Sequence, residues 1–339
     1  MIDLRSDTVT RPTAAMRTAM LEAAVGDDVF GEDQTMNAFE EKIAAMFGMD
    51  AGLFVPSGTM SNQISLHLLS EPGDEILIES TGHIFNYEAS AASWLSSVQL
   101  NPLTGMAGKI DPGSVENHLR GGHDWEPTPK VIAIENSTNK GGGACYTRQE
   151  LLSIHQLARE NNLKLHLDGA RIWNALLEVD YESSWLGSIA DTISVCFSKG
   201  LGAPVGSMIL SGQETIRKAR QVRKRLGGGM RQIGMLAAAA DYAVEHHWPL
   251  LREDHRRARE MAKVIDQCSR LSIDLERVQT NILIFDTLAE DAVSALKKLA
   301  DDEIQMVPFG ENTIRATFHH HITNDDLEQV NASLKKHFQ

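Results

Sequence analysis

The chain has 339 residues, and 32 Lys and Arg against 46 Asp and Glu give it a formal net charge of −14. An acidic protein of ordinary composition, 42% hydrophobic and 23% charged, is a poor partner for nucleic acid or an anionic membrane. It has no apolar window near the ~18 residues of a membrane span, no signal-peptide run and only three scattered cysteines, so we expect a cytoplasmic protein without disulfides or a metal.

Helical and extended patterns alternate along the first two thirds of the chain. Helices are predicted over residues 14–24, which follow Pro12, over 35–47, where apolar residues recur at helical spacing, and over 148–160. A further helix ends near residue 69. Short apolar runs predict strands at 53–55, 76–78, 131–134, 163–167 and 192–197. Strands separated by helices indicate an α/β fold with a mostly parallel sheet covered on both faces.

The pattern changes after about residue 245. A long polar helix is predicted over 250–268, followed by strands at 282–285 and 314–318 and helices near 289–299 and 325–336. This arrangement predicts a small α+β domain, so we divide the chain into residues 1–245 and 246–339. The longest loop is expected at 121–130, where Gly and Pro are frequent.

The first candidate functional feature is a small-residue turn between a strand and a helix. Ser57, Gly58 and Thr59 follow the apolar run at 53–55. Small residues there allow backbone N–H groups to approach an anion, and a helix N-terminus favours negative charge. Taken alone, such a triplet is more often an ordinary strand-to-helix turn than an anion site.

A carboxylate and a lysine end the next two predicted strands. Asp168 follows the run at 163–167, with Arg171 three residues later, and Ser198 and Lys199 follow the run at 192–197. Asp168 could simply cap the next helix, and Lys199 could extend to the surface. Ligands of parallel sheets bind outside the carboxyl ends of the strands, however, which favours a site.

Together these features match the needs of pyridoxal 5′-phosphate. The triplet at 57–59 would bind the phosphate, Asp168 would hold the ring nitrogen protonated, and Lys199 would form the Schiff base. Nucleotide motifs such as the Rossmann glycine pattern and the P-loop do not occur.

The chain resembles the L-threonine aldolases, in the β-eliminating lyase group of fold-type-I pyridoxal-phosphate enzymes. The resemblance extends in order over nearly the whole chain. The matching pieces are Asp3-Leu-Arg-Ser-Asp-Thr-Val-Thr-Arg-Pro12, Gly26-Asp-Asp-Val-Phe30, Ser57-Gly-Thr59, His83, Glu135-Asn136, Leu167-Asp-Gly-Ala-Arg171, Ser198-Lys-Gly-Leu-Gly202 and Gly227-Gly-Gly-Met-Arg-Gln232. The first and last of these pieces are highly specific together.

The resemblance implies an aspartate-aminotransferase-like fold, with residues 1–245 binding the cofactor and 1–25 contributing to the site. It implies a homotetramer that cleaves L-threonine or L-allo-threonine to glycine and acetaldehyde. By the same analogy, His83 stacks on the cofactor ring and lies near the substrate hydroxyl. Because an imidazole titrates near neutrality, we expect His83 to act as the general base, directly or through water; the alternative is that it only stacks on the ring. The substrate carboxylate is bound by Ser6, Arg171 and Arg315, and Lys224 and Arg231 lie near the cofactor at a subunit interface.

This sequence departs from the family at two positions. Many members have histidine where this chain has Thr138, and a second active-site histidine in the preceding loop has no clean counterpart, since His123 is nearest and Trp125 falls in its place. The departures bear on how the substrate hydroxyl loses its proton.

Other functions fit parts of the same sequence. The same Schiff base supports β-elimination, racemisation or cleavage of a bulkier substrate such as phenylserine. A non-catalytic protein of this fold is disfavoured because the lysine, the aspartate and the arginines are all present. A metal-dependent hydrolase would need the run His319-His320-His321, which we expect at a half-exposed strand end where adjacent side chains point to opposite faces.

Overall fold

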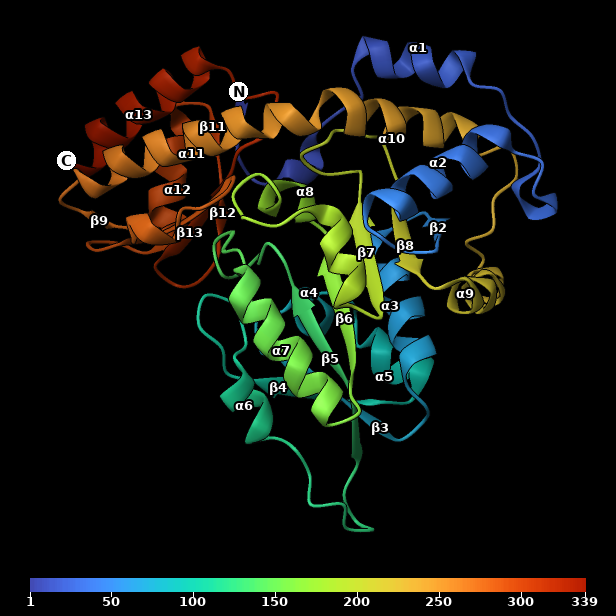
Figure 1. Cartoon of the computed structure of the whole chain (residues 1–339). Helices are drawn as coiled ribbons and strands as arrows, with labels where there is room; N and C mark the ends of the chain where they lie inside the picture. Colours follow the sequence, from blue (N-terminus) through green and yellow to red (C-terminus); the bar gives the residue numbers. More distant parts are fainter.

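The structure, a computed structural model, describes the whole chain, residues 1–339. Its largest unit is built on a seven-stranded sheet (Figure 1). In order across the sheet, the strands are β2 (Ala51–Val55), β8 (Ser207–Ser211), β7 (Thr192–Cys196), β6 (Lys164–Gly169), β5 (Thr128–Glu135), β3 (Asp74–Glu79) and β4 (Gln99–Leu103). Only β8 runs antiparallel to its neighbours. The predicted mostly parallel sheet is therefore confirmed.

Helices cover both faces of this sheet because alternate residues of each strand point to opposite sides. In β5, Ile132 and Ile134 enter a core that α7 shares, whereas Val131 and Ala133 pack on the side of α3 and α5. The helices of this unit are α1 (Ala14–Glu22), α2 (Gln34–Met46), α3 (Gly58–Leu69), α4 (His83–Asn86), α5 (Ala91–Ser96), α6 (Pro112–Glu116), α7 (Arg148–Glu160), α8 (Ile172–Ala175), α9 (Gln213–Arg225) and α10 (Gly234–His246).

A second, smaller unit has its own antiparallel sheet and its own hydrophobic core. The sheet has the order β12 (Val307–Pro308), β13 (Thr313–Thr317), β10 (Ile282–Thr287) and β9 (Leu271–Ser272). It packs with α11 (Leu251–Asp266), α12 (Ala292–Asp301) and α13 (Asn324–Phe338). The start of the chain joins this unit, because β1 (Ile2–Asp3) pairs in parallel with β11 (Ile304–Gln305) and Leu4 lies in its core. Figure 1 shows the N-terminus beside these C-terminal elements.

Short 3₁₀ helices connect the main elements. They are η1 (Asp7–Val9), η2 (Asp28–Phe30), η3 (Ser183–Ser188), η4 (Trp248–Leu250) and η5 (Leu275–Arg277). None of the helices combines the length and the apolar composition that a membrane span requires.

The predicted elements are present, but several others were not predicted, among them β4, β8, α9 and α10. The edge strand β4 contains Pro102, which a strand tolerates only where no neighbour needs its N–H. Helix α9 is highly charged and buries few apolar side chains, chiefly Ile216, Ala219 and Val222. Helix α7 occupies the predicted residues 148–160 in full.

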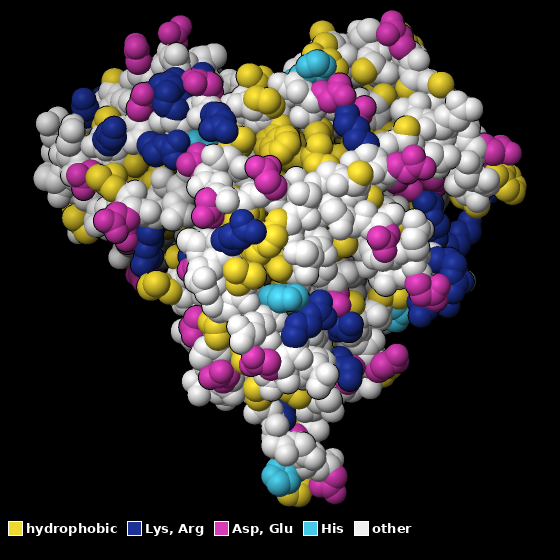
Figure 2. Space-filling view, in the orientation of Figure 1, with side chains coloured by type: hydrophobic (Ala, Val, Ile, Leu, Met, Phe, Trp, Pro, Cys, Tyr) yellow, Lys and Arg dark blue, Asp and Glu magenta, His cyan; other side chains and the backbone are white.

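The predicted end of the loop over 121–130 is wrong, because β5 already begins at Thr128. The remainder projects beyond the sheet at the bottom of Figure 1, and Figure 2 shows histidine, acidic and hydrophobic side chains at its tip. His123 stacks on Trp125 there with ring centroids 4.5 Å apart, and Trp125 is 76% exposed.

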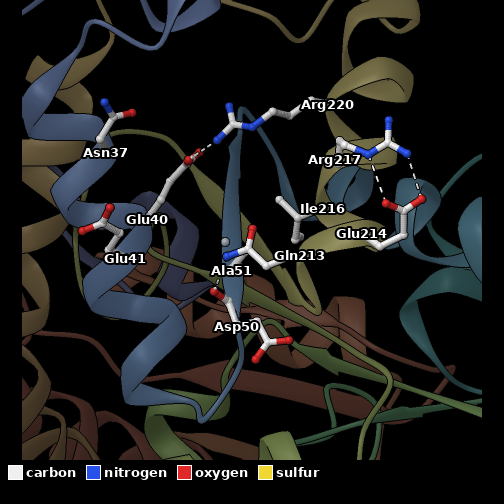
Figure 3. A pocket seen from close by; sticks show the side chains of 11 residues that line it. Asn37, Glu40, Glu41, Asp50, Ala51, Gln213, Glu214, Ile216, Arg217 and Arg220 are labelled. Carbon is white, nitrogen blue, oxygen red and sulfur yellow. Dashed lines mark hydrogen bonds and ion pairs between the residues drawn. The ribbon is translucent and has the colours of Figure 1, made fainter.

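The outer edge of the sheet at β2 is closed by a buried glutamate. Glu40 on α2 accepts a hydrogen bond from the backbone N–H of Phe54 (2.7 Å) and pairs through its other oxygen with Arg220 on α9 (2.5 Å; Figure 3). Burial raises the pKa of Glu40, against the opposing charge of Arg220. A cavity of about 510 Å³ lies between these elements, with Glu214 and Arg217 paired at its rim. The unpaired strand edge is thus covered by side chains.

An isolated acid lies at the junction of the two units. Asp254 on α11 is 1% exposed, and neither carboxylate oxygen has a hydrogen-bond partner; the nearest cation, Arg257, is 3.7 Å away. Burial raises the pKa of Asp254 from 3.8 to about 8; Arg257 opposes this shift, and Asp7 adds to it. An acid with a raised pKa binds its proton more tightly in the folded chain. The contribution of Asp254 to stability is therefore greatest below pH 3.8 and falls as the pH rises to about 8.

We expect Asp254→Asn, which has no charge to bury, to raise the thermal midpoint relative to the parent protein. The gain should grow with pH, being small at pH 5 and roughly 5 °C or more at pH 8.5. Differential scanning calorimetry at both pH values measures it, with Asp266→Asn at an exposed position of the same helix as control. An equal gain at both pH values would show that ionisation of Asp254 does not limit stability.

Candidate active site

The predicted site residues lie where the parallel strands end. Ser57, His83, Asp168 and Lys199 belong to the carboxyl ends of β2, β3, β6 and β7 or to the segments that follow them. Parallel strands bring these ends to one edge of the sheet, which is where α/β proteins bind ligands.

The turn at 57–59 forms the N-terminus of α3, a helix of 12 residues. Ser57 caps it by accepting a hydrogen bond from the backbone N–H of Met60 at 3.2 Å. A Cβ on Gly58 would lie 2.8 Å from the sulfur of Cys196, so the absence of a side chain permits this close approach to β7. The N–H groups of Gly58 and Thr59 have no partner within the helix and can bind an anion.

Lys199 is half-buried in the turn after β7. Its Nζ lies 3.7 Å from the Sγ of Cys196, and its carbonyl accepts a 2.8 Å hydrogen bond from Thr10 in the N-terminal segment. Cys196 also accepts a hydrogen bond from Ser207 (3.0 Å). The adjacent Ser198 is half-buried and makes no side-chain hydrogen bond within the chain. Nothing in the sequence pattern singled out Cys196, yet it separates the lysine from the helix N-terminus.

Asp168 is buried within the last residues of β6. One oxygen accepts a hydrogen bond from the backbone of Ala170 (3.0 Å), so the local capping interpretation is part of its role. The other accepts a hydrogen bond from the side-chain amide of Asn62 on α3 (2.9 Å). The Asn62 oxygen in turn contacts His166 Nε2 at 3.2 Å, and His166 Nδ1 contacts the Thr192 hydroxyl at 2.8 Å. Asp168 therefore belongs to a buried polar chain as well as to a turn.

His83 begins the short helix α4 beside Asp168. Its Nδ1 lies 2.9 Å from Glu88, a carboxylate with a fully buried side chain. Burial lowers the pKa of His83, but the hydrogen bond to Glu88 and the charge of Asp168 outweigh it and raise the pKa. Ligand atoms of His83, Glu88 and Asp168 lie within 4.8 Å of one another, and the amide N–H₂ of Asn62 donates to both carboxylates.

A second buried acid borders the same space. Glu135 ends β5 in register with Asp168, and it accepts hydrogen bonds from the backbone N–H groups of His83 (3.2 Å) and Asn139 (3.1 Å). Burial and the nearby charge of Asp168 raise the pKa of Glu135 to about 7.

Arg171 is anchored by an acid from the start of the chain. Its Nε and Nη2 donate to the two oxygens of Asp7 at 2.8 and 2.7 Å, and both side chains are buried. The pKa of Asp7 is lowered because Arg171 outweighs the effect of burial, and Asn281 from the smaller unit adds a hydrogen bond of 3.3 Å. Only Nη1 of Arg171 remains without a hydrogen bond in the chain.

Arg315 and Ser6 approach from the small unit and the N-terminal segment. Arg315 donates to Asn139 (2.8 Å) and to the backbone oxygen of Arg5 (3.0 Å), while its buried Nε has no partner. Burial and the neighbouring charge of Arg171 lower the pKa of Arg315. The Ser6 oxygen accepts hydrogen bonds from the backbone and side chain of Thr8, which leaves its hydroxyl hydrogen available.

Other predicted residues lie apart from this set within one chain. Arg231 is exposed and pairs with Asp27 (2.9 Å), and Lys224 is exposed on α9. Thr138 is buried and donates to the carbonyl of Ala107 (3.0 Å), so its hydroxyl has a structural partner.

The expectation for the histidine run is wrong. Strand β13 ends at Thr317, and His319, His320 and His321 form a turn in which His319 is 2% exposed. The strand ends there because the next residues hydrogen-bond to other segments. His319 donates to the carbonyl of Asp3 (2.8 Å), and His321 accepts from the backbone N–H of Arg11 (2.9 Å). These contacts fasten the N-terminal segment to the small unit.

The sequence matches the model of the beta-eliminating lyase family over residues 3–288. The chain belongs to the β-eliminating lyase family. It is 39% identical over 333 residues to low-specificity L-threonine aldolase 1 of Arabidopsis thaliana, with 96% of this chain and 93% of the relative covered. It is 36% identical over 333 residues to the low specificity L-threonine aldolase of Escherichia coli K12, with 98% of each chain covered. This β-eliminating lyase is thus a member of the threonine aldolase group.

Solved structures agree on the fold of this lyase. A threonine aldolase of Leishmania major superposes with a TM-score of 0.85 at 19% identity, covering 99% of both chains. An aspartate aminotransferase mutant of Thermus thermophilus gives 0.75 at 15% identity, covering 99% of this chain and 91% of the other. The predicted aminotransferase-like fold is confirmed.

Pyridoxal 5′-phosphate is the cofactor of this family, and the donor set of this lyase fits it. A helix N-terminus with free N–H groups suits the phosphate, a buried carboxylate suits a protonated ring nitrogen, and a half-buried lysine suits the aldehyde. Gly58 leaves space that a Cβ would fill, and the unpartnered Nε of Arg315 lacks an acceptor that a bound carboxylate would supply.

The buried pair of Asp7 and Arg171 yields a stability prediction. Asp7→Asn keeps the shape of the side chain but leaves the buried guanidinium uncompensated, so we expect a loss of about 3 to 5 kcal/mol in the free energy of unfolding. Asp3→Asn breaks only a partly exposed pair with Arg5 and should cost less than about 1 kcal/mol. Urea unfolding of both variants in the same cofactor state measures the difference. Equal losses in the free energy of unfolding would show that the buried Asp7–Arg171 pair contributes no more to stability than the partly exposed Asp3–Arg5 pair.

Proposed function

We propose that this lyase cleaves L-threonine and L-allo-threonine to glycine and acetaldehyde. The observation that carries the proposal is the pair of incompletely satisfied guanidiniums, Arg171 after β6 and Arg315 on β13 of the small unit, near the strand ends that hold Lys199 and Asp168. That combination suits an amino acid, because the arginines bind its carboxylate and the lysine site accepts its amine. The names of the relatives, low-specificity L-threonine aldolases, favour this substrate.

The residues that would hold the cofactor follow from their positions. Ser57, Gly58, Thr59 and Ser198 would bind the phosphate, and Asp168 would bind the ring nitrogen. Lys199 would attach the cofactor covalently, and His83 would lie against the ring. Arg231 and Lys224, which lie apart within one chain, would approach the site of a neighbouring subunit.

The chain itself does two things in the reaction. The cofactor, when bound, draws electrons from the carbon–carbon bond that breaks. Ser6, Arg171 and Arg315 fix the substrate carboxylate, since guanidinium forks donate parallel hydrogen bonds to it. His83 then removes the proton of the β-hydroxyl at Nε2, directly or through water, a contribution of typically ~10² to 10⁴-fold. Thr138 takes no part, because its hydroxyl is bound to a backbone carbonyl.

The proposal also covers the domain division, the cellular location and the oligomeric state of the enzyme. We take residues 1–245 as the cofactor-binding domain, with 1–25 contributing to the site, and 246–339 as the small domain. The separate core of the small domain, which Ile2 and Leu4 join from the N-terminal segment, supports this division. A cytoplasmic location is supported by three free, buried cysteines. A homotetramer is supported by exposed apolar side chains in the N-terminal region, including Leu21 and Phe30.

The proposed reaction predicts glycine and acetaldehyde in equal amounts when the cofactor-loaded enzyme meets L-threonine or L-allo-threonine. D-threonine should give neither product, and phenylserine tests tolerance for a bulkier side chain. Parallel assays of glycine and aldehyde measure this. A change in cofactor absorbance without glycine would contradict aldol cleavage and favour β-elimination or racemisation.

Replacement of Lys199 tests the cofactor assignment. Lys199→Ala removes the amine that holds the cofactor, so we expect loss of its protein-bound visible absorbance and a fall in glycine release of roughly 10³-fold or more. Lys164→Ala at the opposite end of β6 is the control, because its exposed amine pairs with Asp191. If Lys199→Ala kept both signals, the assignment of Lys199 would be wrong.

A further inference from the structure

Glu88 is a buried carboxylate that the proposed mechanism does not yet use. It follows α4, and its side chain has no exposed surface. Two side-chain amides and one imidazole nitrogen surround it. His83 Nδ1 and the Asn62 amide approach one oxygen, both at 2.9 Å, and the Gln63 amide approaches the other at 2.6 Å. Because the amides donate to both of its oxygens, the pattern is that of a carboxylate and not of a carboxylic acid.

This contact decides which nitrogen of His83 carries its proton. A carboxylate can only accept, so Nδ1 of His83 must donate to it, and in the neutral ring Nε2 is left with the lone pair. Nε2 is therefore the nitrogen available to take a proton from a ligand. A carboxylate behind a histidine orients catalytic bases in other enzymes by the same physics.

The two carboxylates fix the orientation of Asn62, whose N–H₂ group lies 2.9 Å from each of them, and His166 lies on the other side. Burial lowers the pKa of His166 to about 4, so its ring is neutral, and it contacts the Thr192 hydroxyl through one nitrogen and the Asn62 oxygen through the other. With its oxygen facing His166, Asn62 must direct its N–H₂ group toward Glu88 and Asp168. A single amide thus joins the carboxylate behind His83 to the carboxylate at the proposed ring-nitrogen site.

We propose that Glu88 is the positioning residue of the His83 base: it fixes the proton on Nδ1, directs Nε2 toward the substrate, and is held in place through Asn62 by the residue that binds the cofactor ring. The proposal rests on the proposed function, in which His83 acts as the base. It deepens that function by assigning a role to a carboxylate outside the reacting groups.

The charged groups around His83 set the expected direction of the effect. Glu88 and Asp168 favour its protonated form, Lys199 disfavours it, and Glu135 touches only its backbone N–H. Removing the charge of Glu88 should therefore lower the pKa of His83, by about one unit or more for a carboxylate in direct contact.

The variant Glu88→Gln suits this test because the fold can accommodate it. The oxygen of the new amide can still accept from His83 and Asn62. Its N–H₂ group needs an acceptor, and the buried Oε1 of Gln63 has no partner at present. Turning the Gln63 amide over brings this oxygen toward position 88, so that the new amide finds an acceptor, while the Gln63 N–H₂ group takes the place where its oxygen has no partner now.

The first measurement is an NMR titration of the histidines in the cofactor-free protein, with His83→Asn identifying the His83 signal. In Glu88→Gln the His83 pKa should fall by about one unit or more. The control Glu75→Gln changes another fully buried glutamate, paired with Arg120, and should leave the His83 signal unmoved. An unchanged His83 titration in Glu88→Gln would overturn the proposal.

The second measurement is the pH dependence of kcat for the cofactor-loaded variant. A weaker base that loses its proton at lower pH should move the acidic limb to lower pH and reduce kcat roughly tenfold. A shifted His83 titration with an unchanged pH profile would also overturn the proposal, because His83 would not be the base that Glu88 positions. If the parent enzyme released glycine from no substrate, the proposed function would fail, while the cofactor-free titration would still report on the contact.

Discussion

A buried guanidinium requires a buried carboxylate, and the architecture of this lyase depends on where the chain supplies one for Arg171. The arginine follows a central strand of the larger sheet, and its partner, Asp7, comes from the start of the chain. Asn281 of the small unit binds the same carboxylate. A single acid thus connects three separate parts of the molecule, because the free energy of leaving the arginine unpaired would be prohibitive.

The need to give buried polar groups partners also explains why the site is assembled from distant segments. Thr10 binds the carbonyl of Lys199, and Arg315 binds the carbonyl of Arg5. The N-terminal segment therefore lies between the lysine turn and the small unit. Several candidate site residues, including Arg171 and Arg315, are thus held by a partner from another element, which gives the rigid surroundings that precise chemistry requires.

The sequence predicted the ends of the strands better than the network behind them. Lys199 and Asp168 follow conspicuous apolar runs, so the rule for parallel sheets places them at one edge. Asn62 and Glu88 follow no such run. The only local signal for Asn62 is the polar stretch Ser61-Asn62-Gln63 inside a helix that packs against buried strands, where buried amides need partners. The partner that Asn62 finds, Asp168, lies 106 residues away in the sequence, and local periodicity carries no information about such a contact.

The histidine run shows a different limit. The argument from alternation assumed that the strand continues through it, but Phe318 already donates its backbone N–H to Asn281 outside the strand, and a turn follows. Ends of elements are set by tertiary hydrogen bonds of this kind, which propensity does not encode. The hydrogen bond of Thr138 was not predictable for the same reason, since its partner Ala107 lies in another loop.

The pairing of the first strand with a strand near the other end of the chain has a consequence for biosynthesis. Ile2 lies opposite Ile304, so β1 has no strand partner until the chain has been synthesised as far as β11. The seven-stranded sheet can assemble while the chain is still growing, since its strands all precede residue 212. The candidate site cannot, and the segment around β1 must stay available for pairing until β11 has been synthesised.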